Sequence, residues 1–315
     1  MTMAGALLRR RFPVLPASVQ RFFDIEPGTR VRGDSHWQAD RTNHPTLVLL
    51  HGLEGSSDSG YMLGTAEKAF LAGFNVVRLN QRNCGGTEQL TETLYHSGRS
   101  ADFRTIVLEL IERDRLPALV FAGFSMGGNL ALKMAGEFQD SAPAALRGIV
   151  AVAPCVDLAA CSDALSERRN FLFNRHFVRS LKRRMRAKAE LFPDVYAKNG
   201  GMAELGRVRT VRQFDEAITA RFCGFEGADD YYARSSAMHF LKAIRMPTLV
   251  VTAQDDPFVP FRIFQRAVIR ENPNIQLVAP PYGGHCAFIS QQSGRERFWC
   301  EARIVEFSEQ QARAI

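Results

Sequence analysis

Six short apolar runs rich in β-branched residues recur along the chain, separated by longer and more polar stretches. They span residues 46–50, 74–79, 118–122, 148–153, 248–253 and 275–279. Apolar runs of this length without polar alternation are typical of strands buried on both faces of a parallel sheet. Two further strand-like runs, 20–25 and 30–37, flank the turn signal Glu26-Pro27-Gly28 nearer the N-terminus.

Helical patterns lie between these runs, at residues 61–72, 100–115, 128–137 and 260–271, and after the last run at residues 291–310. Strands that alternate with helices form right-handed βαβ units, and these units place helices on both faces of an open sheet. We therefore predict the α/β class, with a mostly parallel sheet that is covered by helices on both sides.

One long stretch, residues 154–243, has helical, basic and aromatic sequence without a further buried strand. In open α/β sheets ligands bind at the carboxyl ends of the strands, so an insertion here is predicted to form a cap over that site. We expect residues 1–153 and 244–315 to form the two parts of the core and residues 154–243 to form the cap. The length of 315 residues suits one large α/β domain or two ordinary ones.

A candidate nucleophile follows the apolar run 118–122. Gly123-Phe124-Ser125-Met126-Gly127 is a G-x-S-x-G pattern between a predicted strand and a predicted helix. A sharp strand-to-helix turn holds the serine hydroxyl clear of the backbone, and glycines two residues to either side permit the close packing that it requires. We predict that Ser125 is the nucleophile; the alternative is a serine in an ordinary glycine-rich turn.

A serine nucleophile needs a base, and the base needs an orienting carboxylate. In this type of fold the acid and then the histidine follow the serine along the chain, each after a strand. His285 follows the last apolar run and is the predicted base. Asp255 and Asp256 both follow the preceding run. A loop of this type tends to place the acid four residues before the proline that opens the following helix. Asp256 lies four residues before Pro260, which favours it as the acid and leaves Asp255 as a structural residue of the loop.

The loop His51-Gly52-Leu53-Glu54-Gly55, after the run 46–50, is expected to supply one donor for a substrate oxyanion. A second donor is expected at the N-terminus of the helix after Ser125. We predict that the backbone amides of Leu53 and Met126 form this oxyanion hole. His51 is an alternative base, but its place before Ser125 in the chain favours a structural role.

These motifs together resemble an α/β-hydrolase of the YheT-like esterase group, which is related to the abhydrolase-domain lipid hydrolases of eukaryotes. The resemblance covers about residues 29–307 and rests on HGLEGSS (51–57), NQRNCGG (80–86), YHSG (95–98), GFSMGGN (123–129), FDEAITARFCGF (214–225), DYY (230–232), DDPFVP (255–260) and GGHCAF (283–288). It implies a serine hydrolase with Ser125, Asp256 and His285 as its catalytic residues. Asn83 stands where the group's pattern has glycine, which leaves the form of that turn open. We expect Arg82, Tyr95, His96 and Asp102 to fix the long loop from Asn80 to Ser100; the alternative is that they line the site.

The predicted function is the hydrolysis of carboxylic esters through an acyl-enzyme on Ser125. The phenylalanines of the predicted cap indicate an apolar acyl pocket, which suits acylglycerols, phospholipids or short- to medium-chain acyl esters. An acyltransferase or a thioesterase with the same residues is one alternative. A non-catalytic α/β-hydrolase scaffold that binds a ligand or partner is another, because a fold alone does not determine a function.

The net charge of +7 is concentrated in residues 166–190, which hold nine basic and two acidic side chains. Apolar side chains recur there at helical spacing, at Phe173, Phe177, Val178, Leu181 and Met185. We interpret the basic residues as the solvated face of a cap helix. Peripheral contact with an anionic membrane is the alternative. No nucleic-acid-reading module accompanies the charge, so nucleic acid is not an expected partner.

The remaining features favour a cytoplasmic protein that works without a cofactor. The six cysteines lack paired spacing, which suits reduced thiols in a chain of this size. The apolar run before Arg9 is short and its charges follow it, unlike a secretory signal. The seven histidines show no metal-binding spacing, and no phosphate or dinucleotide loop follows a strand.

Overall fold

The apolar runs form the centre of one eight-stranded sheet in the computed structural model, which describes residues 10–198 and 201–313. The strands are β1 (Val19–Glu26), β2 (Thr29–His36), β3 (Thr46–Leu50), β4 (Asn75–Leu79), β5 (Leu119–Phe124), β6 (Leu146–Val152), β7 (Thr248–Val251) and β8 (Ile275–Val278). Every residue of β3, β4 and β5 is buried, as expected for strands covered on both faces. The predicted N-terminal run before Arg9 lies outside the described residues.

The strands lie in the order β1-β2-β4-β3-β5-β6-β7-β8. Strands β3 to β8 are parallel to one another, whereas β1 and β2 extend one edge as an antiparallel pair. From β3 the chain crosses to β4 on one side and then to β5 on the other, and Leu50 of β3 pairs with Gly123 of β5. This reversal brings the loops after β3 and β5 together, at the place where ligands bind in open α/β sheets.

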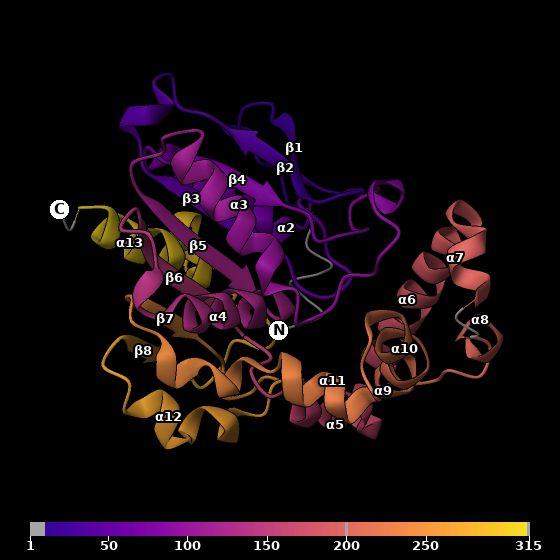
Figure 1. Ribbon diagram of the computed structural model, residues 1–315. Helices are drawn as coiled ribbons and strands as arrows, with labels where there is room; N and C mark the ends of the chain where they lie inside the picture. The colour runs from indigo at the N-terminus through magenta and orange to yellow at the C-terminus, as the bar shows by residue number, and fades with distance from the viewer. Residues whose placement is uncertain (1–9, 199–200, 314–315) are drawn as a thin grey trace.

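Helices cover both faces of the sheet (Figure 1). Helices α2 (Gly60–Leu71) and α13 (Trp299–Arg313) contact each other and bury their apolar side chains against one face. Helices α3 (Ser100–Glu112), α4 (Met126–Phe138) and the short α12 (Ala267–Arg270) pack against the other face. The predicted α/β class and the two-sided covering of the sheet are therefore confirmed.

The chain between β6 and β7 is helical and extends to one side of the sheet (Figure 1). Its helices are α5 (Leu158–Ser166), α6 (Phe171–Leu191), α7 (Pro193–Lys198), α8 (Gly201–Glu204), α9 (Val211–Phe214), the π-helical turn η5 (Asp215–Thr219), α10 (Ala220–Cys223) and α11 (Ala228–Ser235). No strand occurs in its described residues, 154–198 and 201–243. Val178, Leu181 and Met185 of α6 join the main core, so the segment packs on the sheet domain through an apolar face.

Two predicted helices are interrupted in the structure. The stretch 260–271 divides into the 3-10 helix η8 (Phe261–Gln265) and α12, because Arg266 between them has extended backbone with ψ 143°. The stretch 291–310 becomes an α-helix only at Trp299. Gly294 has φ +66°, which a continuous right-handed helix cannot contain, and Ile289 pairs with Phe298 in a β-bridge.

The prediction that the basic residues of α6 form a solvated face is wrong for two of them. The Arg184 side chain is only 12% exposed, and Lys188 is fully buried. Lys188 Nζ donates to the backbone oxygens of Glu88 and Thr91, which satisfies the buried ammonium group. Both residues lie three positions after an apolar residue of the buried face, Leu181 and Met185, and therefore face inwards as well.

No helix in the described part of the chain combines the length and the apolar character that a membrane-spanning segment requires.

Candidate functional site

Ser125 occupies a strained turn between β5 and α4. Its φ of 53° and ψ of −116° lie in a region that residues with a side chain rarely adopt. The flanking glycines are sterically required. A Cβ on Gly123 would lie 2.1 Å from the Gly127 oxygen, and a Cβ on Gly127 would lie 2.5 Å from the His51 oxygen. The sequence therefore builds the sharp turn that the G-x-S-x-G pattern predicted.

Ser125, His285 and Asp256 are linked by consecutive hydrogen bonds. His285 Nε2 lies 2.9 Å from Ser125 Oγ, and His285 Nδ1 lies 2.8 Å from Asp256 Oδ2. The second carboxylate oxygen, Oδ1, accepts from the amides of Phe258 and Val259 at 2.8 and 3.1 Å. Because an ionised carboxylate only accepts, Nδ1 carries the proton and leaves Nε2 to accept from the serine hydroxyl.

The electrostatics of His285 reflect two opposing effects. Burial disfavours the imidazolium, whereas the buried Asp256 carboxylate stabilises it. Asp256 and, to a smaller extent, Cys286 together outweigh burial, so the pKa of His285 lies well above its ordinary value. Asp256 thus both orients the ring and stabilises a positive charge on it.

The Asp255 carboxylate binds the backbone of the loop that precedes His285. Its Oδ1 accepts from the amides of Gly283 and Gly284, at 2.8 Å each. These bonds hold the segment of the chain that leads to His285. This segment is tightly packed, because a Cβ on Gly283 would lie 2.5 Å from the Phe288 ring. Asp255 therefore contacts the histidine loop and Asp256 contacts the histidine.

The loop after β3 lies directly against the serine. A Cβ on Gly52 would lie 3.0 Å from Ser125 Cβ, and the Gly52 amide donates to the Tyr61 hydroxyl at 3.1 Å. His51 is buried behind this loop, with Nε2 accepting from the Gln81 amide at 3.0 Å and Nδ1 2.7 Å from the Gly52 oxygen. Burial lowers the pKa of His51 to about 4. Both ring nitrogens are therefore occupied, which is a structural arrangement.

A cavity of about 120 Å³ opens at the serine. Ser125, His285, Leu53 and Met126 line it at the sheet side. Its other walls are mostly apolar and come largely from the helical segment between β6 and β7, with Leu158, Leu165, Phe177, Leu181, Met185, Val211, Phe214, Tyr231 and Tyr232 among the lining residues. Four of the five predicted site residues therefore line one apolar cavity, and the fifth, Asp256, contacts His285 at its Nδ1.

Cys155 belongs to this site, although the sequence analysis did not single it out. Its Sγ lies 3.5 Å from Ser125 Oγ, and its side chain lines the cavity. A hydrogen bond from Cys161 is the largest influence on the Cys155 thiol and lowers its pKa below the ordinary value. The available signal was positional, because Cys155 follows β6, the immediate neighbour of β5 in the sheet.

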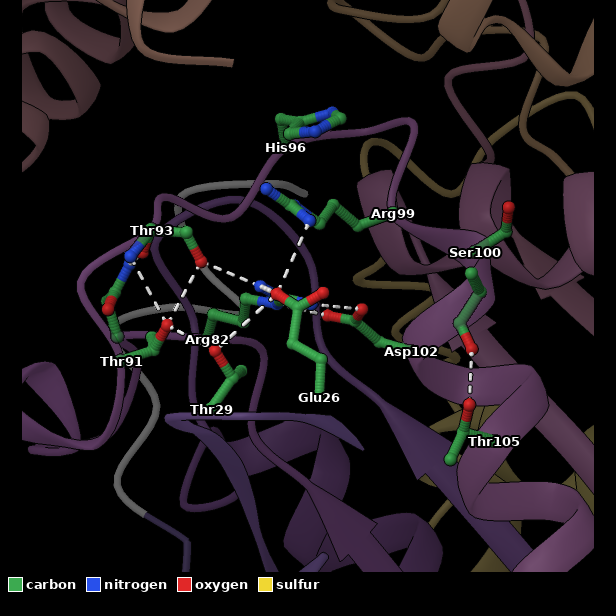
Figure 2. Close-up of polar contacts among 12 residues, drawn as sticks. Glu26, Thr29, Arg82, Thr91, Thr93, His96, Arg99, Ser100, Asp102 and Thr105 are labelled. Carbon is green, nitrogen blue, oxygen red and sulfur yellow. Dashed lines mark hydrogen bonds and ion pairs between the residues drawn. The ribbon is translucent and has the colours of Figure 1, made fainter. Parts of the chain in front are cut away.

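Arg82 anchors the long loop between β4 and α3 rather than the cavity. Figure 2 shows its side chain between Asp102, Glu26 and Thr93. Nε and Nη2 each donate to Asp102 at 2.6 Å, and Nη1 donates to Glu26 at 2.5 Å and to Thr93 Oγ1 at 2.6 Å. The expected structural role of Arg82 and Asp102 is confirmed. The neighbouring Asn83 adopts φ 64°, which asparagine tolerates better than most residues, so the turn forms without glycine.

Across residues 10–198 and 201–313, no group of three or more His, Cys, Asp or Glu side chains is arranged to hold a metal ion.

Comparisons with known proteins agree with this geometry. A model of the alpha/beta hydrolase fold family matches residues 45–195. The chain is 34% identical over 311 residues to the Escherichia coli (strain K12) protein named "Putative esterase YheT", covering 97% of this chain and 88% of that one. It is 29% identical to the phospholipase ABHD3 of Mus musculus, covering 81% of this chain and 61% of that one.

Two further relatives extend the comparison. The medium-chain fatty acid ethyl ester synthase/esterase 2 of Saccharomyces cerevisiae is 28% identical over 90% of this chain and 66% of its own. This chain therefore spans about two thirds or less of the mouse and yeast proteins. The Pyrococcus furiosus esterase Pf2001 superposes with a TM-score of 0.61 at 16% identity, over 97% of this chain and 95% of that one. The chain thus belongs to the α/β-hydrolase family.

Proposed function

We propose that this protein is a carboxylic ester hydrolase that works through an acyl-enzyme on Ser125. The observation that carries the proposal is the hydrogen-bonded sequence from Ser125 Oγ through His285 to Asp256. Ser125 attacks the acyl carbonyl while His285 Nε2 takes its proton, and Asp256 holds the ring in the required tautomer. His285 then returns the proton to the leaving alcohol, and water activated by the same histidine hydrolyses the acyl-enzyme.

The amides of Leu53 and Met126 are the proposed oxyanion donors. Met126 begins α4, so its N–H belongs to the unpaired amides of a helix N-terminus. Leu53 lines the cavity beside Ser125, one residue after the glycine that packs on the serine. Within the described residues neither amide donates a hydrogen bond to a protein atom. Both are therefore available for the negative oxygen of a tetrahedral intermediate.

The helical residues 154–243 act, in this proposal, as a cap that forms the acyl pocket. The apolar side chains that this segment contributes to the cavity favour an uncharged hydrocarbon chain over a polar acyl group. Relatives named esterase, phospholipase and medium-chain fatty acid ethyl ester synthase/esterase support an ester of a lipid or of a medium-chain acid as the substrate.

Hydrolysis of a series of p-nitrophenyl esters with increasing acyl length tests this function. We expect kcat/KM to rise with chain length while added methylenes fill the apolar cavity, at about fourfold per buried methylene, and then to fall. Release of p-nitrophenol is the measurement. Correctly folded protein that cleaves none of the esters and takes no label from a fluorophosphonate would favour a non-catalytic binding scaffold.

Acyl transfer to an alcohol is the second candidate, and the name of the yeast ethyl ester synthase/esterase favours it. The chemistry differs only in the group that attacks the acyl-enzyme on Ser125. Adding ethanol to the ester assay separates the two, because a transferase forms ethyl ester whereas a hydrolase forms mainly free acid. A thioester substrate in the same assay tests the thioesterase alternative.

We also propose that α6 brings the site to anionic membranes. Arg175, Arg179, Arg183 and Arg186 are exposed at spacings of four, four and three, which places them on one face of the helix. Phe171 and Leu172 at its start are 58% and 64% exposed. The apolar face of α6 packs inside the protein, so electrostatic attraction, assisted by these two side chains, would supply the contact.

Charge reversal of Arg179 and Arg183 to glutamate is expected to weaken binding to anionic vesicles by about 30-fold or more, because each basic residue near the surface contributes about 1 kcal/mol. Arg184 is left intact because it is buried. Co-sedimentation with phosphatidylglycerol vesicles is the measurement. The same reversal of Arg245 and Arg270, which lie outside α6, is the control; an equal loss in both variants would contradict the proposal.

A further inference from the structure

The residue that follows Leu53, Glu54, has an unfavourable backbone conformation. Its φ is +57°, and the Gly55 amide donates to the Gly52 oxygen at 3.1 Å. Residues 52–55 therefore form a tight turn with Glu54 at its third position. A positive φ at the third position of such a turn strongly favours glycine, so a glutamate there requires support from elsewhere in the fold.

That support comes from the cap helix. The Glu54 side chain is 3% exposed, and its Oε1 accepts from Arg184 Nε at 2.9 Å and from the Tyr95 hydroxyl at 2.6 Å. Arg184 Nη2 lies 3.4 Å from Glu54 Oε2, and Nη1 donates to Glu88 at 3.2 Å. A guanidinium that presents several donors to a buried carboxylate fixes its position as well as its charge.

The ionisation of the pair agrees with this geometry. Burial alone would raise the pKa of Glu54, but the Arg184 charge and its hydrogen bonds lower it below the ordinary value. Because Glu54 and Glu88 already neutralise Arg184, the guanidinium is not available for an anionic substrate, although it lines the cavity. The cluster therefore joins three segments: the turn 52–55, the loop before α3 and helix α6.

We infer that Glu54 and Arg184 are positioning residues, which hold the turn 52–55 in the conformation that presents the Leu53 amide to the substrate oxyanion. This inference rests on the proposed function. The inference gives α6 a second role besides forming a wall of the cavity. Through Arg184 and Glu54, the packing of α6 on the sheet domain stabilises the transition state at the turn 52–55. Glu54 itself is not among the residues that line the cavity. Because Glu54 does not contact the bound substrate, removing its side chain should lower kcat and leave KM nearly unchanged.

Replacing Glu54 with alanine and with glycine tests the inference. Alanine removes the ion pair and keeps the strain at φ +57°, so we expect kcat to fall about a hundredfold, as for a small misplacement of a reacting group. Glycine removes the ion pair and the strain together, so we expect it to recover much of that loss. Arg184→Met should lower kcat as Glu54→Ala does, and the double variant should add little further.

Glu301→Ala is the matched control. Glu301 is also a buried carboxylate, 5% exposed, with Arg10 and Lys68 as partners, but it lies on α13 across the sheet from α6. We expect it to lower the thermal stability of the fold without a selective loss of kcat. Ester turnover with a fitted kcat and KM, together with the affinity of an alkylboronic acid as an analogue of the tetrahedral intermediate, are the measurements.

The possible failures are distinguishable. A wild-type protein that hydrolyses no ester would overturn the proposed function and this inference with it. An active wild type with Glu54→Ala at wild-type kcat, or with alanine and glycine variants that lose the same kcat, would overturn the positioning role alone. If Glu54→Ala fails to fold, Arg184→Met still decides, because unchanged kcat and unchanged boronic acid affinity in that variant would contradict the inference.

Discussion

Replacing Ser125 with alanine is expected to abolish covalent labelling by a fluorophosphonate and to lower ester hydrolysis by about a million-fold. In the proposed function the hydroxyl oxygen forms the acyl-enzyme, and it lies 2.9 Å from Nε2 of the proposed base, His285. The proposed oxyanion donors and the pocket remain in the variant, so a small rate above the uncatalysed reaction should persist. Mass spectrometry of the intact labelled protein and initial rates of ester cleavage are the measurements.

Cys155 provides the control for this result. Its thiol lies 3.5 Å from Ser125 Oγ in the same cavity and can react with an electrophile when the serine is absent. We therefore compare Ser125→Ala with the double variant that also carries Cys155→Ser. Label that survives in the first and disappears in the second would come from the thiol. Label that survives in both, or ester cleavage at the wild-type rate, would exclude Ser125 as the nucleophile.

The central strands could be predicted from the sequence because each is a short apolar run that ends at a polar or glycine-rich loop. The run 46–50 coincides with β3, whose residues are all buried, so no tertiary contact competes with the local pattern. The division of the stretch 260–271 could not be predicted in this way. Its apolar spacing suits one continuous helix, but the extended backbone of Arg266 interrupts that helix. The Arg266 guanidinium is bound to Asp157 across 109 residues, a contact that local periodicity cannot reveal.

The site shows the same division between local and distant information. Ser125, Asp256 and His285 could be proposed because each follows a buried strand, and carboxyl ends of parallel strands meet at one edge. The partnership of Glu54 with Arg184 could not, since the two lie 130 residues apart and the arginine stands in a run of charges. A partial signal existed: Arg184 lies three residues after Leu181, on the side of α6 that packs inwards.

Replacing Asp256 with asparagine is expected to lower kcat about ten-thousand-fold while Ser125 and His285 stay in place. The amide can donate to Nδ1 and so favours the wrong tautomer of His285, in which Nε2 carries the proton and cannot accept one from the serine.

The change from Asp256 to asparagine should also move the pH dependence of kcat/KM. Catalysis needs neutral His285, so activity is lost as the pH falls through the pKa of this histidine. Burial lowers that pKa, and the Asp256 carboxylate is the largest influence that raises it. Without the carboxylate, the residual kcat/KM should persist to lower pH than in the wild type.

Asp255→Asn is the matched control, because it makes the same chemical change one residue away. Asp255 accepts from the amides of Gly283 and Gly284, whereas His285 Nδ1 lies 2.8 Å from Asp256, so the loss of the Asp255 carboxylate should loosen the histidine loop without altering the tautomer. For Asp255→Asn we expect a lower melting temperature and a much smaller loss of kcat than for Asp256→Asn. The low-pH side of the kcat/KM profile, its acid limb, should not shift. A pH profile of kcat/KM for both variants makes the comparison. If Asp255→Asn moved the acid limb and Asp256→Asn did not, the orienting carboxylate would be Asp255, and the hydrogen bond between His285 and Asp256 would have to be replaced by another during catalysis.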